Sequence, residues 1–214
     1  MEAPTIVPND RRADIGQERI VGKYLKKYFY DRVFDDVEVV FDTERQLSGI
    51  DVVADGMLID NKAQSSPKYV NHPRDTFILE LSILNKDGEV IPGWFIDTKS
   101  RTTHYLFVWI GNALVDDSNR ILPRGINEVE VMLVSKSEIM EKIISKYPIS
   151  RLLNIANRMR EFEMKHYNAN IIGCKFSHSP QLKEKPVNIV TRKDFLKQCA
   201  TLHCRVTPEG IVHI

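Results

Sequence analysis

Two aspartates and a lysine near residue 55 have the types and spacing that phosphodiester chemistry requires. The segment 48–64 reads SGIDVVADGMLIDNKAQ, in which two apolar runs flank an Asp-Gly pair at 55–56. Such a pair between apolar runs predicts a hairpin with a tight type I′ turn. In that register Asp51 faces Asp60, with their Cβ atoms about 5 Å apart. Lys62 shares a face with Asp60, because side chains alternate along a strand.

Two carboxylates placed opposite each other repel unless a cation joins them. A divalent cation reverses the sign of the interaction, because both carboxylates become its ligands. The ordinary alternative is a solvated hairpin face, on which single Asp and Lys residues carry no function. Both strands are too apolar for a solvated hairpin, and buried charges need partners or a metal. We therefore expect a metal site at Asp51 and Asp60, with Lys62 beside it.

Length and composition are those of a globular α/β protein. The 214 residues suit one domain, and 43% of them are hydrophobic and 28% charged. A net charge of +1 provides no global basic field, so a nucleic acid would have to meet a local patch. Three cysteines do not form a disulfide framework and predict a reducing, cytoplasmic setting. We expect no membrane span and no secretion signal.

A first helix is expected over residues 14–30, with Asp14 and Gln17 in a capping-box pattern. The apolar residues that recur at helical spacing are Val21, Tyr24, Leu25, Tyr28 and Phe29. Extending this stripe one turn back reaches Glu18, and a carboxylate on the core-facing side needs a cation. The alternative is an exposed first-turn residue favoured by the helix dipole. We expect Glu18 to join Asp51 and Asp60, directly or through a metal-bound water.

The remaining chain alternates strands, loops and helices. We expect strands over 37–41, 76–84, 103–110, 128–134 and 187–190, and helices over 137–147, 150–166 and near 195. Glu80 lies inside one expected strand, either as a further ligand or paired with a basic side chain. The loop after Gln64 carries Lys68, His72 and Arg74, which could contact a phosphate backbone but are more simply solvated.

Cysteine and histidine spacing raises a second candidate metal site. Cys174 and His178 repeat the spacing of Cys199 and His203, and Cys204 adjoins the second pair. Two such pairs supply zinc-ligating residue types, but the spacing is not that of a common zinc finger. We favour the simpler interpretation of small buried cysteines without zinc.

The motif around the hairpin resembles that of the PD-(D/E)XK nuclease superfamily. Asp60-Asn61-Lys62 matches the (D/E)-x-K element of that family, and Asp51 matches its upstream aspartate. The residue before Asp51 is Ile50 rather than Pro, at a position that varies in the family. The expected order of helix, strand and hairpin is also similar to the core of the family.

Two further positions extend the resemblance, which covers roughly the first half of the chain. Glu18 lies on the expected first helix, and Lys62-Ala63-Gln64 matches a lysine-x-glutamine form of some family branches. The implied fold is a restriction-endonuclease-like core, a mixed central β-sheet flanked by helices. We expect a single domain over 1–214, with the core at about 13–135 and a C-terminal helical elaboration at about 136–214.

The resemblance implies Mg²⁺-dependent hydrolysis of nucleic acid, most of all DNA, with Mn²⁺ as a substitute. Asp51, Asp60 and Glu18 would hold the metal, and the backbone carbonyl of Asn61 or Ala63 would complete its shell. Lys62 would hold water or stabilise the phosphate, and Gln64 is expected among the catalytic residues. One alternative is a non-catalytic nucleic-acid-binding or assembly module that keeps the fold. Another is a hydrolase of small phosphate esters. A homodimer is one way for a near-neutral chain to assemble a DNA-binding groove.

Overall fold

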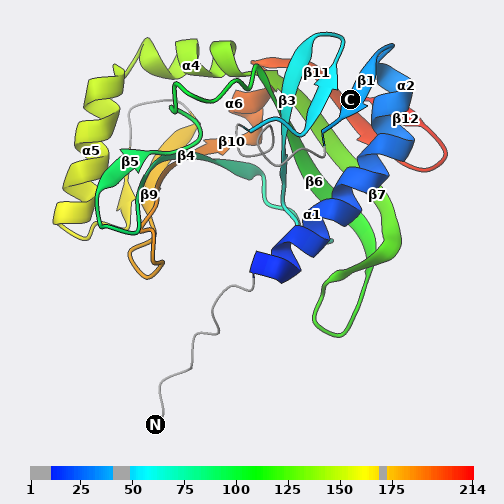
Figure 1. The fold of residues 1–214 in the computed structure, drawn as a ribbon, viewed down its shortest axis with the longest axis horizontal. Helices are drawn as coiled ribbons and strands as arrows, with labels where there is room; N and C mark the ends of the chain where they lie inside the picture. The colour runs from blue at the N-terminus through cyan, green and yellow to red at the C-terminus, as the bar shows by residue number, and fades with distance from the viewer. Residues whose placement is uncertain (1–10, 41–48, 169–172) are drawn as a thin grey trace.

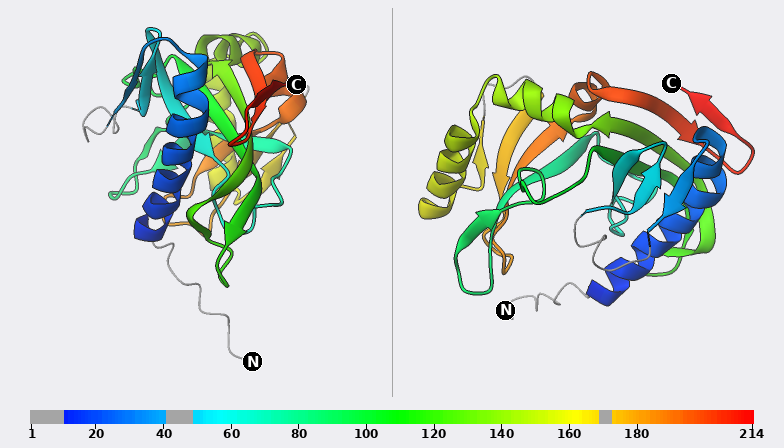
Figure 2. Two further views of the ribbon diagram at one scale, coloured as in Figure 1. Left: turned by 90° about the vertical axis from the view of Figure 1, so that its right-hand side faces the viewer. Right: turned by 45° about the horizontal axis from the view of Figure 1, so that its top comes forward.

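The computed structural model describes residues 11–40, 49–168 and 173–214, which form two β-sheets and several helices. Figure 1 shows the two sheets side by side, with helix α1 across one sheet and α5 at the outer side of the other. The two further views in Figure 2 show that the sheets curl, so that the molecule is arched. The expected α/β class, with a mixed central sheet and flanking helices, is confirmed.

Sheet A is the mixed central sheet. Its strands, in spatial order, are β1 (Val37–Val39), β2 (Val52–Ala54), β3 (Met57–Ala63), β6 (His104–Val115), β7 (Ile121–Ser135), β11 (Ala200–Val206) and β12 (Ile211–His213). Strands β3 and β6 are parallel, and the other paired neighbours described in this sheet are antiparallel. Strand β6 therefore occupies the central position that its apolar sequence predicted.

Sheet B is antiparallel and is built from both halves of the chain. Its strands, in spatial order, are β5 (Val90–Pro92), β4 (Thr76–Leu84), β10 (Val187–Arg192), β9 (Cys174–His178) and β8 (His166–Tyr167). Strands β4 and β5 lie in the crossover between parallel strands β3 and β6. Strand β10 lies between β4 and β9, so the C-terminal part of the chain completes this sheet.

The helices lie outside the sheets. They are α1 (Arg11–Leu25), the π-helical turn η1 (Lys26–Tyr30), α2 (Asp31–Val33), α4 (Lys136–Ile144), α5 (Ile149–Glu161) and α6 (Lys193–Lys197). In the part of the chain that the structure describes, no helix is both long and apolar enough to cross a bilayer.

Two hydrophobic cores lie on opposite faces of sheet A. Side chains of β6 alternate between them, as the two-residue period of a strand requires. Tyr105 and Phe107 belong to the core shared with sheet B and helices α4, α5 and α6. Leu106 and Val108 belong to the core shared with α1 and η1. The hairpin β2–β3 lies beside β6, so its side chains also face one core or the other.

The first helix does not begin as the capping pattern predicted. The described helix already includes Arg11, so Asp14 lies within it and is not its N-cap. Gln17 is buried, and its Oε1 accepts from the backbone N of Ile121 at 2.7 Å. Its Nε2 donates to the backbone O of Ile121 at 3.4 Å. A tertiary contact with β7 therefore takes the side chain that was expected to cap the helix.

The C-terminal part of the chain differs from the expected helical elaboration. Residues 136–214 supply α4, α5 and α6, but also strands β8 to β12. Strands β11 and β12 extend sheet A, whereas β8, β9 and β10 extend sheet B. Both sheets therefore depend on strands from the two halves of the sequence.

Candidate active site

The β2–β3 hairpin forms in the predicted register. Ala54 pairs with Met57, which leaves a turn of two residues between the strands. These residues, Asp55 and Gly56, have φ angles of 46° and 78°. Positive φ at both central positions is what a type I′ turn requires, and Asp and Gly are residue types that tolerate it. The hairpin prediction is confirmed.

Asp51 and Asp60 lie opposite each other just beyond the regular ladder, which ends at the pair Val52 and Ile59. The backbone N of Asn61 donates to Asp51 Oδ2 at 2.8 Å. A side-chain carboxylate thus takes the acceptor position that a strand carbonyl would hold in a regular ladder. The charge of Asp51 also acts on the Asp60 carboxyl. The two carboxyls are therefore neighbours on one side of the hairpin.

Burial raises the pKa of both aspartates. Asp60 is only 6% exposed, and its burial, together with the charge of Asp51, raises its pKa to about 6. Lys62 opposes this rise, with its Nζ 2.8 Å from Asp60 Oδ2. Burial also raises the pKa of Asp51, against the lowering effect of the hydrogen bond from Asn61. Two carboxyls share one ammonium, so negative charge is incompletely compensated.

The ammonium of Lys62 is held from two sides. Besides its contact with Asp60, it lies 4.6 Å from the centre of the Trp94 ring, a favourable cation–π distance. Trp94 belongs to the segment between β5 and β6, which lies over this end of the hairpin. The Lys62 side chain remains 25% exposed. Asp60 and Trp94 therefore fix the position of the Lys62 ammonium, and the side chain is still accessible to solvent.

Glu80 lies on β4 near this group, beside the backbone of Trp94. The backbone N of Trp94 donates to Glu80 Oε1 at 3.4 Å. Burial raises the pKa of Glu80, while this hydrogen bond and the charge of Lys62 lower it. Within the described ranges, no three side chains of His, Cys, Asp or Glu gather closely enough to hold a metal ion. Glu80 thus lies near Lys62 and does not complete a three-carboxylate group with Asp51 and Asp60.

Gly49 allows the segment before Asp51 to approach Asp60. It has a φ of 75°, in the left-handed region that glycine tolerates. A Cβ at this position would lie 2.8 Å from Thr102 Oγ1 and 3.5 Å from Asp60 Oδ2. Thr102 Oγ1 donates to the backbone O of Gly49 at 2.6 Å. Glycine is therefore required here both by the backbone angle and by the close contact with Thr102.

Tyr105 closes the site on the side of β6, where it pairs with Asp60 in the parallel ladder. Its hydroxyl is buried and has no hydrogen-bond partner in the described part of the chain. Burial and the charge of Asp60 raise the pKa of Tyr105, so the hydroxyl stays neutral. Sequence analysis missed this residue, because the strand over 103–110 was simply apolar. Only the parallel pairing of β3 with β6 brings Tyr105 to the aspartates.

Glu18 is not brought to the aspartates. It is exposed on α1, and its neighbour Gln17 bonds Ile121 at the far end of the β6–β7 hairpin. Asp60 pairs with Tyr105 near the start of β6. At a rise of roughly 3.3 Å per residue, these two ends of β6 lie about 30 Å apart. The structure therefore does not support Glu18 as a metal ligand. Its position fits the alternative interpretation, in which Glu18 is an exposed residue of the helix.

The first helical segment reaches the site through Tyr30 instead. The side chain of Tyr30 is 1% exposed, and its hydroxyl donates to Asn61 Oδ1. Burial, followed by the charge of Asp51, raises the pKa of Tyr30 well above its ordinary value. The apolar stripe of an ideal α-helix did not include this residue, so sequence analysis missed it.

Gln64 holds the crossover that follows β3. Its Nε2 donates to the backbone O of Thr76 at 2.6 Å and of Arg74 at 3.1 Å. Its Oε1 accepts from the backbone N of Arg74 at 2.8 Å. The amide thus anchors the backbone that leads into β4. The catalytic role expected for Gln64 stays a prediction.

The cysteines of the candidate zinc site are buried, and one of its histidines is engaged by a carboxylate. Cys174, Cys199 and Cys204 are buried free thiols. Burial is the first cause that raises the pKa of each thiol, which disfavours the thiolate that zinc requires. His203 Nε2 lies 2.7 Å from Glu130 Oε1 and is engaged by that carboxylate. Packing accounts for the three thiols, and a hydrogen bond to Glu130 accounts for His203.

A second group of partly buried charges, here called the Glu130 cluster, consists of Glu130, Lys193 and His203. Lys193 Nζ lies 2.9 Å from Glu130 Oε2 and 4.6 Å from the centre of the Trp109 ring. Although burial raises the pKa of Glu130, hydrogen bonds from His203 and Lys193 outweigh it, and the pKa is lowered. Glu130 pairs with Trp109, so the cluster lies on the same face of sheet A as Tyr105.

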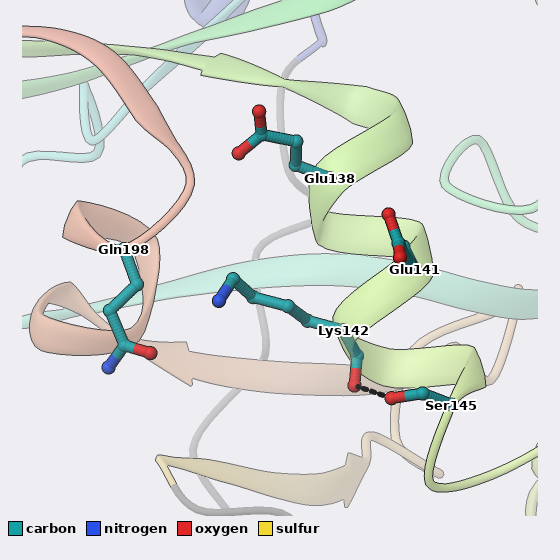
Figure 3. A pocket seen from close by; sticks show the side chains of 5 residues that line it. All are labelled: Glu138, Glu141, Lys142, Ser145 and Gln198. Carbon is teal, nitrogen blue, oxygen red and sulfur yellow. Dashed lines mark hydrogen bonds between the residues drawn. The ribbon is translucent and has the colours of Figure 1, made fainter.

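A separate surface hollow lies between α4 and the end of α6 (Figure 3). Its lining residues are Glu138, Glu141, Lys142, Ser145 and Gln198. All five side chains are exposed, and Figure 3 shows them spread around the hollow, with one hydrogen bond between Ser145 and Lys142. None of the residues predicted for catalysis lies here, and the side chains do not converge on one point.

Comparison with known proteins adds no relative: no protein-family model, curated protein or solved structure matches this chain.

Proposed function

We propose that this protein is a metal-dependent nuclease that hydrolyses phosphodiester bonds of nucleic acid, with DNA as the favoured substrate. The observation that carries the proposal is the placement of the Asp51 and Asp60 carboxyls on one side of the hairpin, with Lys62 Nζ 2.8 Å from Asp60 Oδ2. The oxygens of the two carboxylates can bind a cation, and the Lys62 ammonium beside them can donate to an anion. Phosphodiester hydrolysis uses both, because charge builds on the phosphate while water attacks it.

The two aspartates fit the share of ligands that proteins usually provide to Mg²⁺, for which Mn²⁺ can substitute. Mg²⁺ is commonly held by one or two carboxylates and completes its shell with waters and substrate phosphate. Asp51 and Asp60 would be these ligands. Burial raises the pKa of both, and the charge of Asp51 further raises that of Asp60, so a bound cation would compensate their negative charge. When bound, the ion would lower the pKa of a coordinated water and neutralise charge on the phosphate.

Lys62 would act on the substrate side of the pair. Its ammonium is fixed by Asp60 and the Trp94 ring, yet its side chain is 25% exposed. A donor held in place before the reaction stabilises developing charge without a cost of reorganisation at that moment. Lys62 would therefore hold the attacking water or stabilise the phosphate. Asp60 and Trp94 fix the position of the ammonium.

The same arrangement supports a restriction-endonuclease-like core of the PD-(D/E)XK kind as a finer proposal. Helix α1, hairpin β2–β3 and the parallel neighbour β6 follow the order expected for such a core. Asp51, Asp60 and Lys62 lie together at the hairpin. Glu18 departs from the expected pattern, so we propose no metal ligand from the first helix.

A nucleic-acid partner is favoured by basic side chains close to the hairpin in the chain. Lys68, His72 and Arg74 are exposed in the crossover segment that Gln64 anchors. Exposed cations are suited to phosphate contacts, which supply most of the non-specific affinity for DNA. Since the net charge of the chain is only +1, a homodimer would help by placing two such segments along one duplex.

A non-catalytic nucleic-acid-binding or assembly module is the second candidate. The contact between Lys62 and Asp60 favours it, because an ion pair at 2.8 Å can hold the hairpin without any metal. In that case the cluster would be structural, and removal of either partner would chiefly cost stability.

Cleavage assays distinguish these candidates. Supercoiled plasmid, single-stranded DNA and RNA should be incubated with the protein in Mg²⁺, Mn²⁺ or EDTA. We expect cleavage of DNA that depends on the metal and is lost in Asp60→Asn. The matched control is Asp87→Asn, an exposed aspartate in the turn between β4 and β5, which should cleave like the wild type. Binding of nucleic acid without cleavage in either metal would contradict the nuclease and favour the module.

A further inference from the structure

The π-helical turn η1 changes which side chains face the core. Leu25 is fully buried at the end of α1, and an ideal α-helix would next bury residues three and four positions later. The residues buried next are Phe29 and Tyr30, whereas Tyr28 is only partly buried. A π turn has one more residue per hydrogen-bonded turn than an α-helix, which rotates the following side chains. This rotation brings Tyr30 to the β3 side.

The hydroxyl of Tyr30 makes a specific contact there. It donates to Asn61 Oδ1, at a point where the Tyr30 side chain is 1% exposed. A buried hydroxyl costs free energy unless it has a partner, so this hydrogen bond couples the placement of Tyr30 to that of Asn61. The backbone N of Asn61 in turn donates to Asp51 Oδ2 at 2.8 Å. Three residues are thus linked in the order Tyr30, Asn61 and Asp51.

We propose that Tyr30 is a positioning residue that holds the Asp51 carboxylate, through Asn61, in the orientation needed to share one metal ion with Asp60. This inference rests on the proposed nuclease function. Tyr30 itself would touch neither the ion nor the substrate. Groups that orient metal ligands in this way commonly change metal affinity or activity by about 10- to 100-fold when removed.

Tyr24 provides a matched comparison on the same helix. It is also buried, and its hydroxyl donates to the backbone O of Val206 at 3.0 Å and of Asn127 at 3.3 Å. These acceptors belong to β7 and β11 and have no link to the aspartates. Tyr24→Phe therefore removes a buried hydroxyl of the same kind without touching the proposed relay.

The experiment compares Tyr30→Phe with Tyr24→Phe by calorimetric titration with Mn²⁺. Both variants keep the ring and should fold. We expect Tyr30→Phe to bind Mn²⁺ about 10-fold more weakly, and Tyr24→Phe to bind it like the wild type while melting at a lower temperature. Amide hydrogen exchange in the metal-free protein gives a second readout, in which Tyr30→Phe should lose the protection of the Asn61 amide. A merely structural hydroxyl would change neither readout selectively.

A second variant removes the acceptor. Asn61→Ala should weaken Mn²⁺ binding as Tyr30→Phe does, and the double variant should lose no more than either alone, because both act through one relay. Additive losses, or wild-type Mn²⁺ affinity in Tyr30→Phe, would overturn the role of Tyr30 while the wild type still binds metal and cleaves DNA. If the wild type itself takes no Mn²⁺, even with DNA present, the proposed function and this inference both fail.

Discussion

The aspartate pair and the Glu130 cluster lie on the same face of sheet A. Acidic side chains outnumber basic ones in the aspartate pair with Lys62, and basic side chains outnumber acidic ones in the Glu130 cluster. In the Glu130 cluster, one carboxylate receives Lys193 and His203 at 2.9 and 2.7 Å, and its pKa is lowered. In the aspartate pair, two carboxyls lie beside Lys62, burial raises the pKa of each, and the charge of Asp51 adds to the rise at Asp60. Two donors around one acid stabilise the folded chain, whereas two acids around one donor oppose it.

The comparison separates two uses of buried charge. A balanced group such as the Glu130 cluster needs nothing further and is explained by its contribution to the fold. A group with excess negative charge reduces stability unless a cation compensates it, so its presence calls for another explanation. Function at Asp51 and Asp60 is that explanation, and the following variants can break or sharpen the contrast.

After the loss of cleavage expected for Asp60→Asn, the largest effect is expected for Lys62→Ala. Removing the ammonium should reduce DNA cleavage by about 10²- to 10³-fold, because a fixed donor to the transition state is lost. Mn²⁺ affinity should stay close to that of the wild type, since Lys62 is not a ligand. Cleavage rates and calorimetric titration measure the two quantities. Lys86→Ala, at an exposed lysine in the β4–β5 turn, is the control, and an equal loss in both variants would remove the special role of Lys62.

Glu130→Gln should destabilise the fold by about 2 kcal/mol, because Lys193 and His203 lose their shared carboxylate while remaining partly buried. For a chain of this length, that corresponds to a fall in melting temperature of roughly 4–8 °C. Thermal melts measure it. Glu128→Gln is the control, because Glu128 pairs with Arg205 at 3.7 Å with side chains 39% and 51% exposed. An equal effect of the two variants would mean that the Glu130 cluster is no more than a surface pair.

Asp60→Asn should stabilise the metal-free protein, whereas Glu130→Gln destabilises the fold. The folded pKa of Asp60, about 6, lies above its ordinary value of 3.8. Its stabilising contribution is therefore complete below pH 3.8 and is lost as the pH rises through 6. We expect the variant to be more stable than the wild type by about 1 kcal/mol at pH 8, with the advantage disappearing near pH 4.

Urea unfolding across this pH range measures the difference between the two proteins. Metal should reverse it, because only the wild type would gain free energy of unfolding when Mg²⁺ is added. An Asp60→Asn variant that is less stable than the wild type at pH 8 would place the aspartate pair in the same class as the Glu130 cluster.

The smallest effect is expected for Asp75→Ala. Asp75 lies 3.3 Å from Lys193, but its side chain is 87% exposed. Pairs of this kind contribute little, so the free energy of unfolding should fall by less than about 0.5 kcal/mol. Urea unfolding beside Glu130→Gln tests whether Lys193 depends on Glu130. A loss as large as that of Glu130→Gln would show that Asp75 is an equal member of the cluster.

Features set by neighbouring residues could be predicted from the sequence. The Asp55-Gly56 turn defines the hairpin register locally, and with it the approach of Asp51 to Asp60. The strand over 76–84 matches β4, and the apolar strand expected over 103–110 coincides with β6 from His104 to Ile110. In these segments the hydrophobic period, the turn chemistry and the tertiary position all agree.

Features set by distant partners could not be predicted. Strand β11 pairs with β7, and its polar residues, such as His203, hide the alternation that would predict a strand. The spacing of Cys174 and His178 suggested a metal pattern, but the two residues mark the ends of strand β9. In both cases the environment that decides the structure is supplied by residues far away in the sequence.

The errors at the candidate site have a local cause as well. Projection of an α-helical stripe included Tyr28 and not Tyr30, because it assumes a constant rotation per residue. The π turn η1 breaks that assumption and brings Tyr30 inward, so that its hydroxyl contacts Asn61. Glu18 precedes the π turn and is exposed on α1, so its placement is a separate error.

The placement of β10 and β11 has a consequence for any attempt to shorten the chain. Strand β10 covers one edge of β4, and β11 covers one edge of β7. A fragment ending at residue 135 would keep the aspartate hairpin but would leave both of these edges unpaired. Open strand edges recruit further strands from other molecules. The fragment would therefore be prone to self-association, and the chemistry at the hairpin depends on the completion of two sheets by residues synthesised last.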